Sequence, residues 1–242
     1  MRNTLIWETF IQEFKRLESK LRAISRAGDN DRFYDILDKV EKNNYLIKTK
    51  RSLLLDLYAL RNVFAHADRD KYIAEIKDIA FEEIKKITKL LSNPPTVAEV
   101  FQAEVFTASP NEITEVVLRE MNDKLYTHVP IYQNGKFYGT LSESTLLSWL
   151  LDNIKEGRAQ FYKRLIKDIK REYLFNENDI VDFISGTTSI FEVQAMFEEA
   201  IEKGRRLGAL VITKSGKKDE LPIGIITAWD LPRIDQYIES SI

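Results

Sequence analysis

One ten-residue segment, Pro222-Ile-Gly-Ile-Ile-Thr-Ala-Trp-Asp-Leu231, occurs in related form earlier in the chain, as Phe137-Tyr-Gly-Thr-Leu-Ser-Glu-Ser-Thr-Leu146. In both versions a short apolar run with an embedded glycine ends at a hydroxyl residue, Thr227 or Ser142, and an amphipathic segment follows. This pattern predicts a strand that delivers a hydroxyl group to the first turn of a helix. The unpaired amides of such a turn favour anions.

The two versions differ three residues after the hydroxyl, where the later one has Asp230 and the earlier one has Thr145. In the later version one hydroxyl and one carboxylate are therefore presented where the unpaired helix amides can bind a ligand. The same Thr-x-x-Asp spacing is close to a capping box, in which the side chains only satisfy the helix terminus. The sequence leaves both interpretations open, and Pro232 complicates a helix that begins at Thr227.

The similarity extends beyond these segments and indicates an internal repeat. Ile113 and Ile190 match at a spacing of 77 residues, and Gly139 and Gly224 match at a spacing of 85. Each repeat predicts the order strand, helix, strand, strand, helix. In the first repeat the hairpin is predicted at residues 129–138, around the turn signal Asn-Gly at 134–135. In the second, the paired strands are predicted at 208–213 and 223–227.

The N-terminal part has a helical period throughout. Apolar residues recur at steps of three and four over about 4–27, 33–43, 46–64 and 70–91, which predicts four amphipathic helices in an antiparallel bundle. Pro94 and Pro95 end the bundle. The fold class is therefore α+β and multidomain. A four-helix bundle at 1–93 precedes two β-α-β-β-α units packed as a pair at 96–242, with the first unit at about 96–150 and the second at about 178–242.

Between the two units, at about 151–177, the sequence predicts a connecting basic helix. Seven basic residues lie in it: Lys155, Arg158, Lys163, Arg164, Lys167, Lys170 and Arg171. Acidic residues are interleaved with them, which favours a solvated helix face over a phosphate-binding surface. If the protein acts on RNA, this face is a candidate for contacts with phosphates.

Composition excludes several classes of function. The chain of 242 residues has no cysteine and only two histidines, so a metal enzyme is not expected and no metal site is predicted. No apolar run is long enough for a membrane span, and a cytoplasmic protein without membrane contact is expected. The net charge of −2 differs from the strongly basic balance of a dedicated duplex-DNA binder.

From about Thr96 to Ile242 the chain resembles a tandem pair of CBS domains. The resemblance rests on His128-Val-Pro-Ile-Tyr and Gly139-Thr-Leu-Ser in the first unit and on Gly224-Ile-Ile-Thr-Ala-Trp-Asp-Leu in the second. In this family the two units pack face to face, and the clefts between them bind AMP, ADP, ATP or related adenosyl ligands. We interpret His128 as an ordinary, partly exposed strand residue.

The resemblance also implies roles for single residues. Asp230 would hold the ribose hydroxyls, Thr227 would lie near the phosphates, and the base would be lined by Ile184, Ser185, Gly186 and Thr187. Ser142 is the weaker counterpart of Thr227 in the first unit, where Thr145 supplies no carboxylate. One better-equipped cleft is therefore expected.

A second resemblance lies in the predicted bundle. Arg61-Asn-Val-Phe-Ala-His66 resembles the Arg-x4-His motif of HEPN domains, helical bundles that include metal-independent ribonucleases, over about residues 3–92. It implies that two protomers pair their motifs into one RNA-cleaving site. His66 would remove the 2′-hydroxyl proton, Arg61 would stabilise the phosphorane charge and Asn62 would position the pair. Alternatively, Arg61 and His66 only stabilise the carbonyls of a helix end and pair with Asp68 or Asp70.

These observations predict a homodimer in which a CBS pair senses an adenine nucleotide and the helical bundle is the output or dimerisation element. No further cofactor is required. One alternative is a nucleotide-regulated HEPN ribonuclease with RNA as substrate. Another is a non-enzymatic structural or docking dimer.

Overall fold

The computed structural model describes residues 2–28, 30–66, 77–155, 158–159 and 163–240. The chain divides into two compact units. One consists mainly of residues 1–95 together with Ser189–Met196, and the other of Thr96–Thr188 together with Phe197–Ser241.

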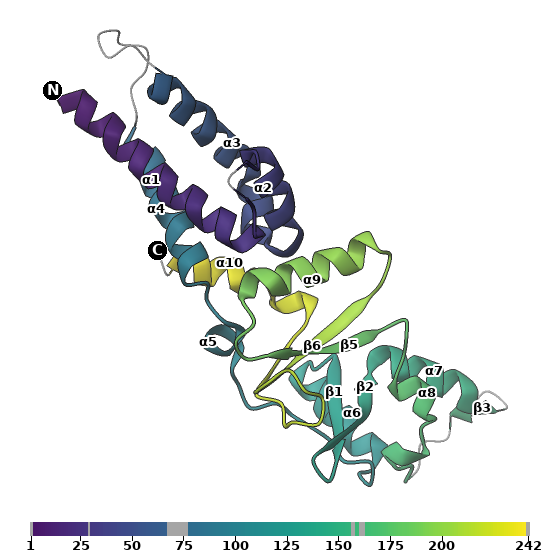
Figure 1. Ribbon diagram of the computed structural model, residues 1–242. Coiled ribbons are helices and arrows are strands. Elements are labelled where there is room, and N and C mark those ends of the chain that lie inside the picture. Colours follow the sequence, from purple (N-terminus) through teal and green to yellow (C-terminus); the bar gives the residue numbers. More distant parts are fainter. Residues whose placement is uncertain (1, 29, 67–76, 156–157, 160–162, 241–242) are drawn as a thin grey trace. The chain divides into compact units, whose positions relative to one another are not determined.

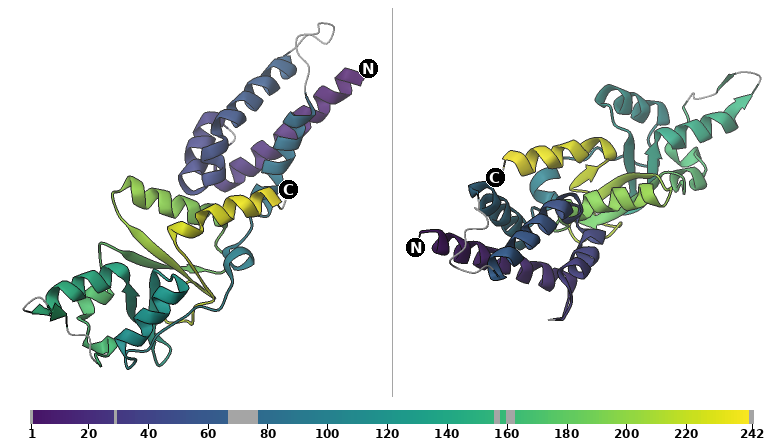
Figure 2. Two further views of the ribbon diagram at one scale, coloured as in Figure 1. Left: turned by 180° about the vertical axis from the view of Figure 1, so that it is seen from behind. Right: turned by 90° about the horizontal axis from the view of Figure 1, so that it is seen from above.

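The first unit contains four long elements, α1 (Arg2–Ser25), α2 (Phe33–Val40), α3 (Tyr45–His66) and α4 (Asp78–Ser92), with a 3₁₀ turn at Glu41–Asn43. Helices α1, α3 and α4 run alongside one another in Figures 1 and 2. The helices predicted at 4–27, 33–43 and 46–64 are confirmed. Residue 77 is not helical, so the described part of the fourth helix begins at Asp78, and the predicted start at residue 70 lies outside the described residues.

The core of this unit follows from the helical period. Phe10, Phe14, Leu17 and Leu21 of α1 have no exposed surface, and they share one apolar cluster with residues of α2, α3 and α4. Aromatic rings from different helices meet in this cluster, for example Phe33 and Tyr58 with ring centroids 4.7 Å apart. Over the central turns of α1, the apolar residues that recur at steps of three and four are therefore the buried ones, as predicted.

The second unit begins with α5 (Val97–Phe101), followed by α6 (Thr114–Lys124), β1 (His128–Gln133), β2 (Lys136–Ser142) and α7 (Glu143–Asn153). Strands β1 and β2 form the predicted antiparallel hairpin. Asn134 and Gly135 have φ values of 52° and 76°, as a tight hairpin turn requires. The first predicted strand of this repeat is reduced to a parallel bridge between Ala108 and Ile131.

The second repeat has β5 (Ile180–Ser185), α9 (Ile190–Glu202), β6 (Leu207–Thr213), β7 (Gly224–Ile226) and α10 (Leu231–Ser240). Strand β5 is parallel to β6, and β6 is antiparallel to β7. The first repeat has the same order and directions, with Ala108 in place of β5. The predicted repeat is thus present in the structure, and the second hairpin lies where the sequence placed it.

The matched glycines Gly139 and Gly224 lie where backbone segments of the two repeats pack closely together. A Cβ atom at Gly224 would lie 2.6 Å from the carbonyl oxygen of Phe101, which ends α5, ahead of Ala108 in the first repeat. A Cβ atom at Gly139 would lie 2.7 Å from Cβ of Leu174, which precedes the second. Each hairpin therefore carries a glycine where the segment leading into the opposite repeat crosses it.

The predicted connecting basic helix at 151–177 is wrong. Helix α7 ends at Asn153 and is followed by short strands β3 (Ile154–Lys155) and β4 (Arg158–Ala159), a 3₁₀ turn (Ile166–Asp168) and the short helix α8 (Arg171–Leu174). The reason is burial: Ile166, Ile169 and Leu174 lie in the core of the first repeat with at most 2% exposure. Burying these side chains outweighs the propensity of a charged sequence for a solvated helix.

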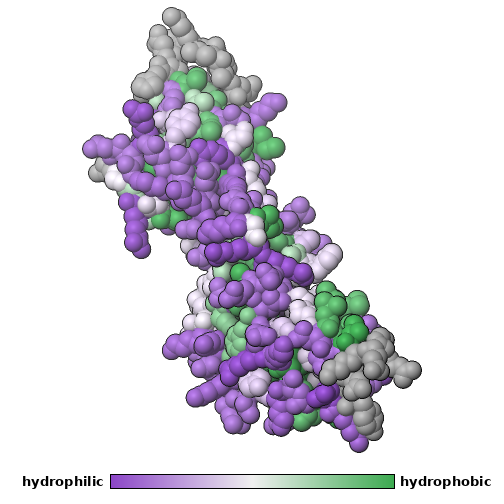
Figure 3. Space-filling view, turned by 90° about the vertical axis from the view of Figure 1, so that its right-hand side faces the viewer, coloured by the Kyte–Doolittle hydropathy of each residue, from purple (hydrophilic) through white to green (hydrophobic). Residues whose placement is uncertain are grey.

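No helix in the described part of the chain is long and apolar enough to cross a membrane. The face drawn in Figure 3 is mostly hydrophilic, with apolar side chains in separate patches. Apolar residues exposed in the second unit include Leu125 and Trp229, at 86% and 85%. Both of these residues line the groove described below.

Candidate functional site

The turn after β7 carries the predicted pair Thr227 and Asp230. Ile226 ends the strand, a 3₁₀ turn spans Ala228–Asp230, and α10 follows with Pro232 in its first turn. Proline is tolerated there because its missing amide would have no partner within the helix. The short 3₁₀ turn therefore removes the difficulty that Pro232 raised.

Asp230 makes the contacts of a capping residue. Its Oδ2 accepts hydrogen bonds from the backbone amide of Thr227 at 2.8 Å and from Thr227 Oγ1 at 2.9 Å. Within the described part of the chain, no group donates to Asp230 Oδ1. One carboxylate oxygen thus holds the turn, and the other can receive a ligand donor.

Thr227 lies on a groove with two adjoining parts. The larger part, about 780 Å³, extends from Thr227 and Asp230 towards α6 and includes Tyr126 and Trp229. The second part, about 570 Å³, extends from Thr227 towards Arg205 and Arg206. Both parts are lined by Thr127, His128, Glu143, Thr227 and Trp229. The volumes are in the range of sites for small molecules and cofactors.

The groove is chemically polarised. Tyr126 and Trp229 offer aromatic surface for a planar ring, and Asp230 offers a carboxylate. Arg205 and Arg206 supply two exposed guanidinium groups in the other part. Sequence reasoning predicted Asp230 but missed Tyr126, Trp229, Arg205 and Arg206 as site residues. Trp229 stands beside Asp230 in the repeated motif, so an aromatic residue next to the carboxylate was the available signal.

The loop at 184–187 lies elsewhere. Ser185 Oγ contacts Thr187 Oγ1 at 2.9 Å, and the backbone amide of Gly186 donates to the carbonyl of Thr213. The carbonyl of Gly186 accepts from Ala98, in the segment that leads into the first repeat. None of Ile184, Ser185, Gly186 and Thr187 lines either part of the groove. The structure therefore does not bring this loop to Thr227 and Asp230 in the groove.

A buried polar cluster joins the two repeats around Asp179, which was not singled out from the sequence. The side chain of Asp179 is 2% exposed. Its Oδ2 accepts hydrogen bonds from Ser142 Oγ at 2.8 Å and Ser144 Oγ at 2.5 Å, and it lies 3.2 Å from His128 Nε2. His128, Ser142 and Ser144 come from the first repeat, whereas Asp179 immediately precedes β5.

The prediction that His128 is partly exposed is wrong, because this residue is 8% exposed and contacts the buried carboxylate. Gly208 packs against this contact: a Cβ atom there would lie 2.3 Å from Asp179 Oδ1 and 2.4 Å from His128 Nε2. Burial raises the pKa of Asp179, but hydrogen bonds from His128, Ser144 and Ser142 outweigh it and leave the pKa well below its usual value. Asp179 is therefore ionised in the folded protein.

Ser142 is thus engaged within the protein. Its hydroxyl donates to Asp179 and accepts the amide of Thr145, as a helix cap does. Thr145 is 1% exposed, and its Oγ1 donates to the carbonyl of Tyr173 at 2.9 Å. Ser142, Thr145 and Asp179 line a smaller pocket of about 230 Å³. In the first repeat, Ser142 and Thr145 therefore form hydrogen bonds to Asp179 and Tyr173, in the segment that leads into the second repeat.

The motif of the bundle is only partly described. Arg61 Nη1 donates to Asn62 Oδ1 at 2.9 Å, and the buried Nε of Arg61 has no hydrogen-bond partner among the described residues. His66 is the last residue of α3. The predicted interaction of the His66 side chain, including its pairing with Asp68 or Asp70, lies outside what the structure describes.

Among the described residues, no group of three or more His, Cys, Asp or Glu side chains could hold a metal ion. The cluster around Asp179 combines one carboxylate, one imidazole and hydroxyl groups, which contact one another through Asp179 Oδ2.

Three solved structures illustrate what the chain is similar to. AcuB of Vibrio cholerae matches with 17% identity and a TM-score of 0.45, over 61% of this chain and 94% of that chain. CBSX2, whose structure contains AMP, matches with 16% identity and a TM-score of 0.43, over 60% and 98%. The CBS domain pair of MJ0100, in complex with 5′-methylthioadenosine and S-adenosyl-L-methionine, matches with 15% identity and a TM-score of 0.40, over 62% and 99%.

All three TM-scores are below 0.5, so these similarities leave the function of this chain open. None of the curated proteins matches the chain. The family model of the CBS domain matches residues 97–152, which confirms the CBS resemblance for the first repeat.

Proposed function

We propose that this protein is a regulatory protein that binds an adenine nucleotide in the groove of its CBS pair. The observation that carries the proposal is the polarity of the groove: Asp230 lies in one part, Arg205 and Arg206 lie in the other, and Trp229 lines both. An aromatic surface suits a purine base, a carboxylate oxygen without a protein donor suits ribose hydroxyls, and guanidinium groups suit phosphate.

The helical bundle is proposed as the output or dimerisation element of a cytoplasmic homodimer. A nucleotide can alter such an output only if it binds two arrangements of the dimer with different affinities. Light scattering of the protein with and without AMP, combined with hydrogen exchange of the bundle, measures whether binding changes assembly or local opening in the bundle. A bundle whose exchange and assembly are insensitive to bound AMP contradicts the output role.

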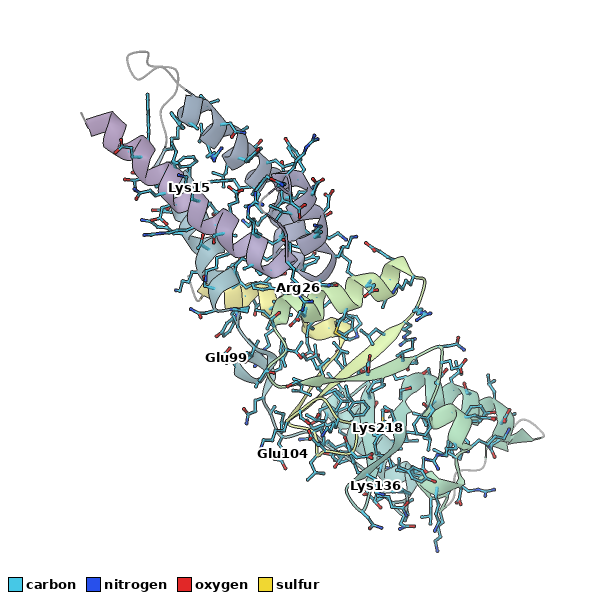
Figure 4. All side chains as sticks on the ribbon, in the orientation of Figure 1. Lys15, Arg26, Glu99, Glu104, Lys136 and Lys218 are labelled. Carbon is cyan, nitrogen blue, oxygen red and sulfur yellow. The ribbon has the colours of Figure 1, made fainter. Side chains whose placement is uncertain are left out.

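Titration calorimetry with AMP, ADP, ATP and adenosine tests the binding itself. Asp230→Asn keeps an oxygen that can accept from Thr227 and removes the charge, so it is milder than truncation to alanine. We expect roughly ten- to hundredfold weaker binding in this variant, since hydrogen bonds to a charged group contribute about 1.5–3 kcal/mol. Glu104→Gln, in the exposed residue labelled in Figure 4, is the matched control and should bind as the wild type does.

Two outcomes contradict the site. One is the absence of binding by all four compounds, which favours a structural or docking dimer. The other is binding that Asp230→Asn leaves unchanged. Melting temperatures of both variants, measured without ligand, separate weakened binding from a destabilised turn.

A second candidate function is RNA cleavage by the bundle. The observation that favours it is the hydrogen bond between Arg61 and Asn62, which lets the two residues act together. RNA incubated in chelator with wild type, His66→Ala and Arg61→Gln should be cut only by the wild type. Lys15→Gln, an exposed basic residue of α1 labelled in Figure 4, is the control. Cleavage that persists in His66→Ala rules this function out.

A further inference from the structure

Arg206 occupies a special place in the groove. It directly precedes β6, and its backbone carbonyl accepts the amide of Ile180 at 2.9 Å. This hydrogen bond fixes Arg206 beside the chain that enters β5. Its side chain is 62% exposed and lines the groove together with Thr227 and Trp229.

The guanidinium group of Arg206 forms an ion pair with the buried carboxylate of Asp179. Arg206 Nε lies 3.4 Å from Asp179 Oδ1, and Asp179 Oδ2 is held by His128 and by the hydroxyls of Ser142 and Ser144. Oδ1 accepts no hydrogen bond from the described residues, and the guanidinium of Arg206 forms an ion pair with it. On the side of Gly208 the carboxylate is closely packed, since a Cβ atom there would lie 2.3 Å from Asp179 Oδ1.

The two Nη groups of Arg206 are available to a ligand. Of the residues that the structure describes, none accepts a hydrogen bond from the two Nη groups of Arg206. A guanidinium held through Nε presents its Nη donors as a planar fork, which matches two oxygens of a phosphate. Since the anchor restricts the side chain before binding, less conformational entropy is lost when a ligand binds.

The opposite end of the groove is unsuitable for phosphate. Asp230 places a carboxylate in that part alone, whereas Glu143 lines both parts, and a phosphate beside Asp230 would meet like charge. The distribution of charge therefore separates the ribose end of the groove from its phosphate end.

We infer that Arg206, positioned by Asp179, recognises the phosphate of the bound ligand, so that the groove selects a phosphomonoester over the corresponding nucleoside. The inference rests on the proposed nucleotide binding and moves the phosphate from the turn at Thr227, where the family resemblance puts it, to Arg206. Asp179 acts through Arg206 and is a positioning residue.

Calorimetry of the full chain with adenosine, AMP, ribose 5-phosphate and inorganic phosphate tests this. The wild type should bind AMP roughly ten- to hundredfold more tightly than adenosine, as expected for charge-assisted hydrogen bonds. Arg206→Gln should abolish this preference and leave the affinity for adenosine unchanged. Lys218→Gln, in the exposed residue labelled in Figure 4, removes the same charge outside the groove and should preserve the preference.

Asp179→Asn provides the readout that a merely structural role would not produce. If Asp179 positions Arg206, the variant loses most of the preference for AMP while its affinity for adenosine is retained. When Asp179→Asn is added to Arg206→Gln, the ratio of the affinities for AMP and adenosine should not change further. A variant that loses affinity for both ligands in equal proportion contradicts the positioning role.

The failures are distinguishable. If neither adenosine nor AMP binds the wild type, the proposed function fails, and this inference fails with it. If both bind with equal affinity, or if Arg206→Gln keeps the preference, only the inference is overturned. Binding of inorganic phosphate that Arg206→Gln abolishes, with AMP bound no more tightly than phosphate, retains the phosphate site and removes its assignment to a nucleotide.

Discussion

The two repeats use the same strand-to-turn motif for different purposes. In the first, Ser142 donates to Asp179 of the other repeat, and Thr145 is fully committed to backbone carbonyls. In the second, Thr227 and Asp230 bond to each other, and both line an open groove. One copy therefore holds the repeats together, while the other remains available to a ligand. Two of the differences between the copies accompany this division of labour. Ser144, which donates to Asp179, matches Trp229, and Thr145 matches Asp230.

We expect the largest effect on the free energy of unfolding from removing the carboxylate of Asp179, which accepts hydrogen bonds from the first copy. Asp179→Ala leaves His128, Ser142 and Ser144 buried without their common acceptor. We expect a loss of about 3–5 kcal/mol in the free energy of unfolding, measured with urea. Asp230→Ala, which removes only a cap from the second copy, should cost about 1 kcal/mol. Equal losses would show that the two copies are energetically alike.

The next prediction tries to convert the first copy into the second. Thr145→Asp recreates the motif, but the new carboxylate would be buried against the carbonyl of Tyr173, which also accepts hydrogen bonds. We expect destabilisation of about 3 kcal/mol and no new ligand stoichiometry in calorimetry. Thr145→Ser keeps the donor and is the control. A stable variant that binds a second nucleotide would refute this account.

The glycines at the matched crossings should respond in parallel. Gly139→Ala and Gly224→Ala each force a Cβ atom into the opposite segment and should lower the free energy of unfolding by about 1–3 kcal/mol. Gly139 should be the more sensitive, because its φ of +152° is unfavourable for alanine as well. Gly28→Ala, which has open space and no such φ, should be nearly neutral in the same unfolding experiment.

The smallest expected effect is the change in the free energy of unfolding for each pH unit. The pKa of Asp179 is lowered in the folded state, so its contribution is complete above the unfolded value of about 3.9 and is lost as the pH falls through the folded value. The stability difference between wild type and Asp179→Asn should therefore shrink by at most about 1.4 kcal/mol per pH unit on acidification from about pH 5 to about pH 3. A difference that grows in acid contradicts the direction of the pKa shift.

Much of the fold follows from local patterns. The periodicity of Phe10, Phe14 and Leu17 is enough to predict α1, and the turn signal at Asn134 is enough to predict the first hairpin, because both depend on neighbours close in the chain. The segment at 151–177 was predicted wrongly for the opposite reason. Its charged residues have a helical pattern, but three apolar side chains are buried in a core formed by distant strands. Local propensity carries no information about that burial.

The candidate site divides in the same way. The sequence by itself determined that one copy of the repeat has a hydroxyl and a carboxylate at a helix start, since spacing fixes their separation. Only the tertiary structure decided that His128 is buried against Asp179, that Ser142 is consumed in this contact, and that Arg206 meets Thr227 and Trp229 in one groove. These residues are far apart in sequence, and it is the crossing of each repeat by the segment leading into the other that brings them together.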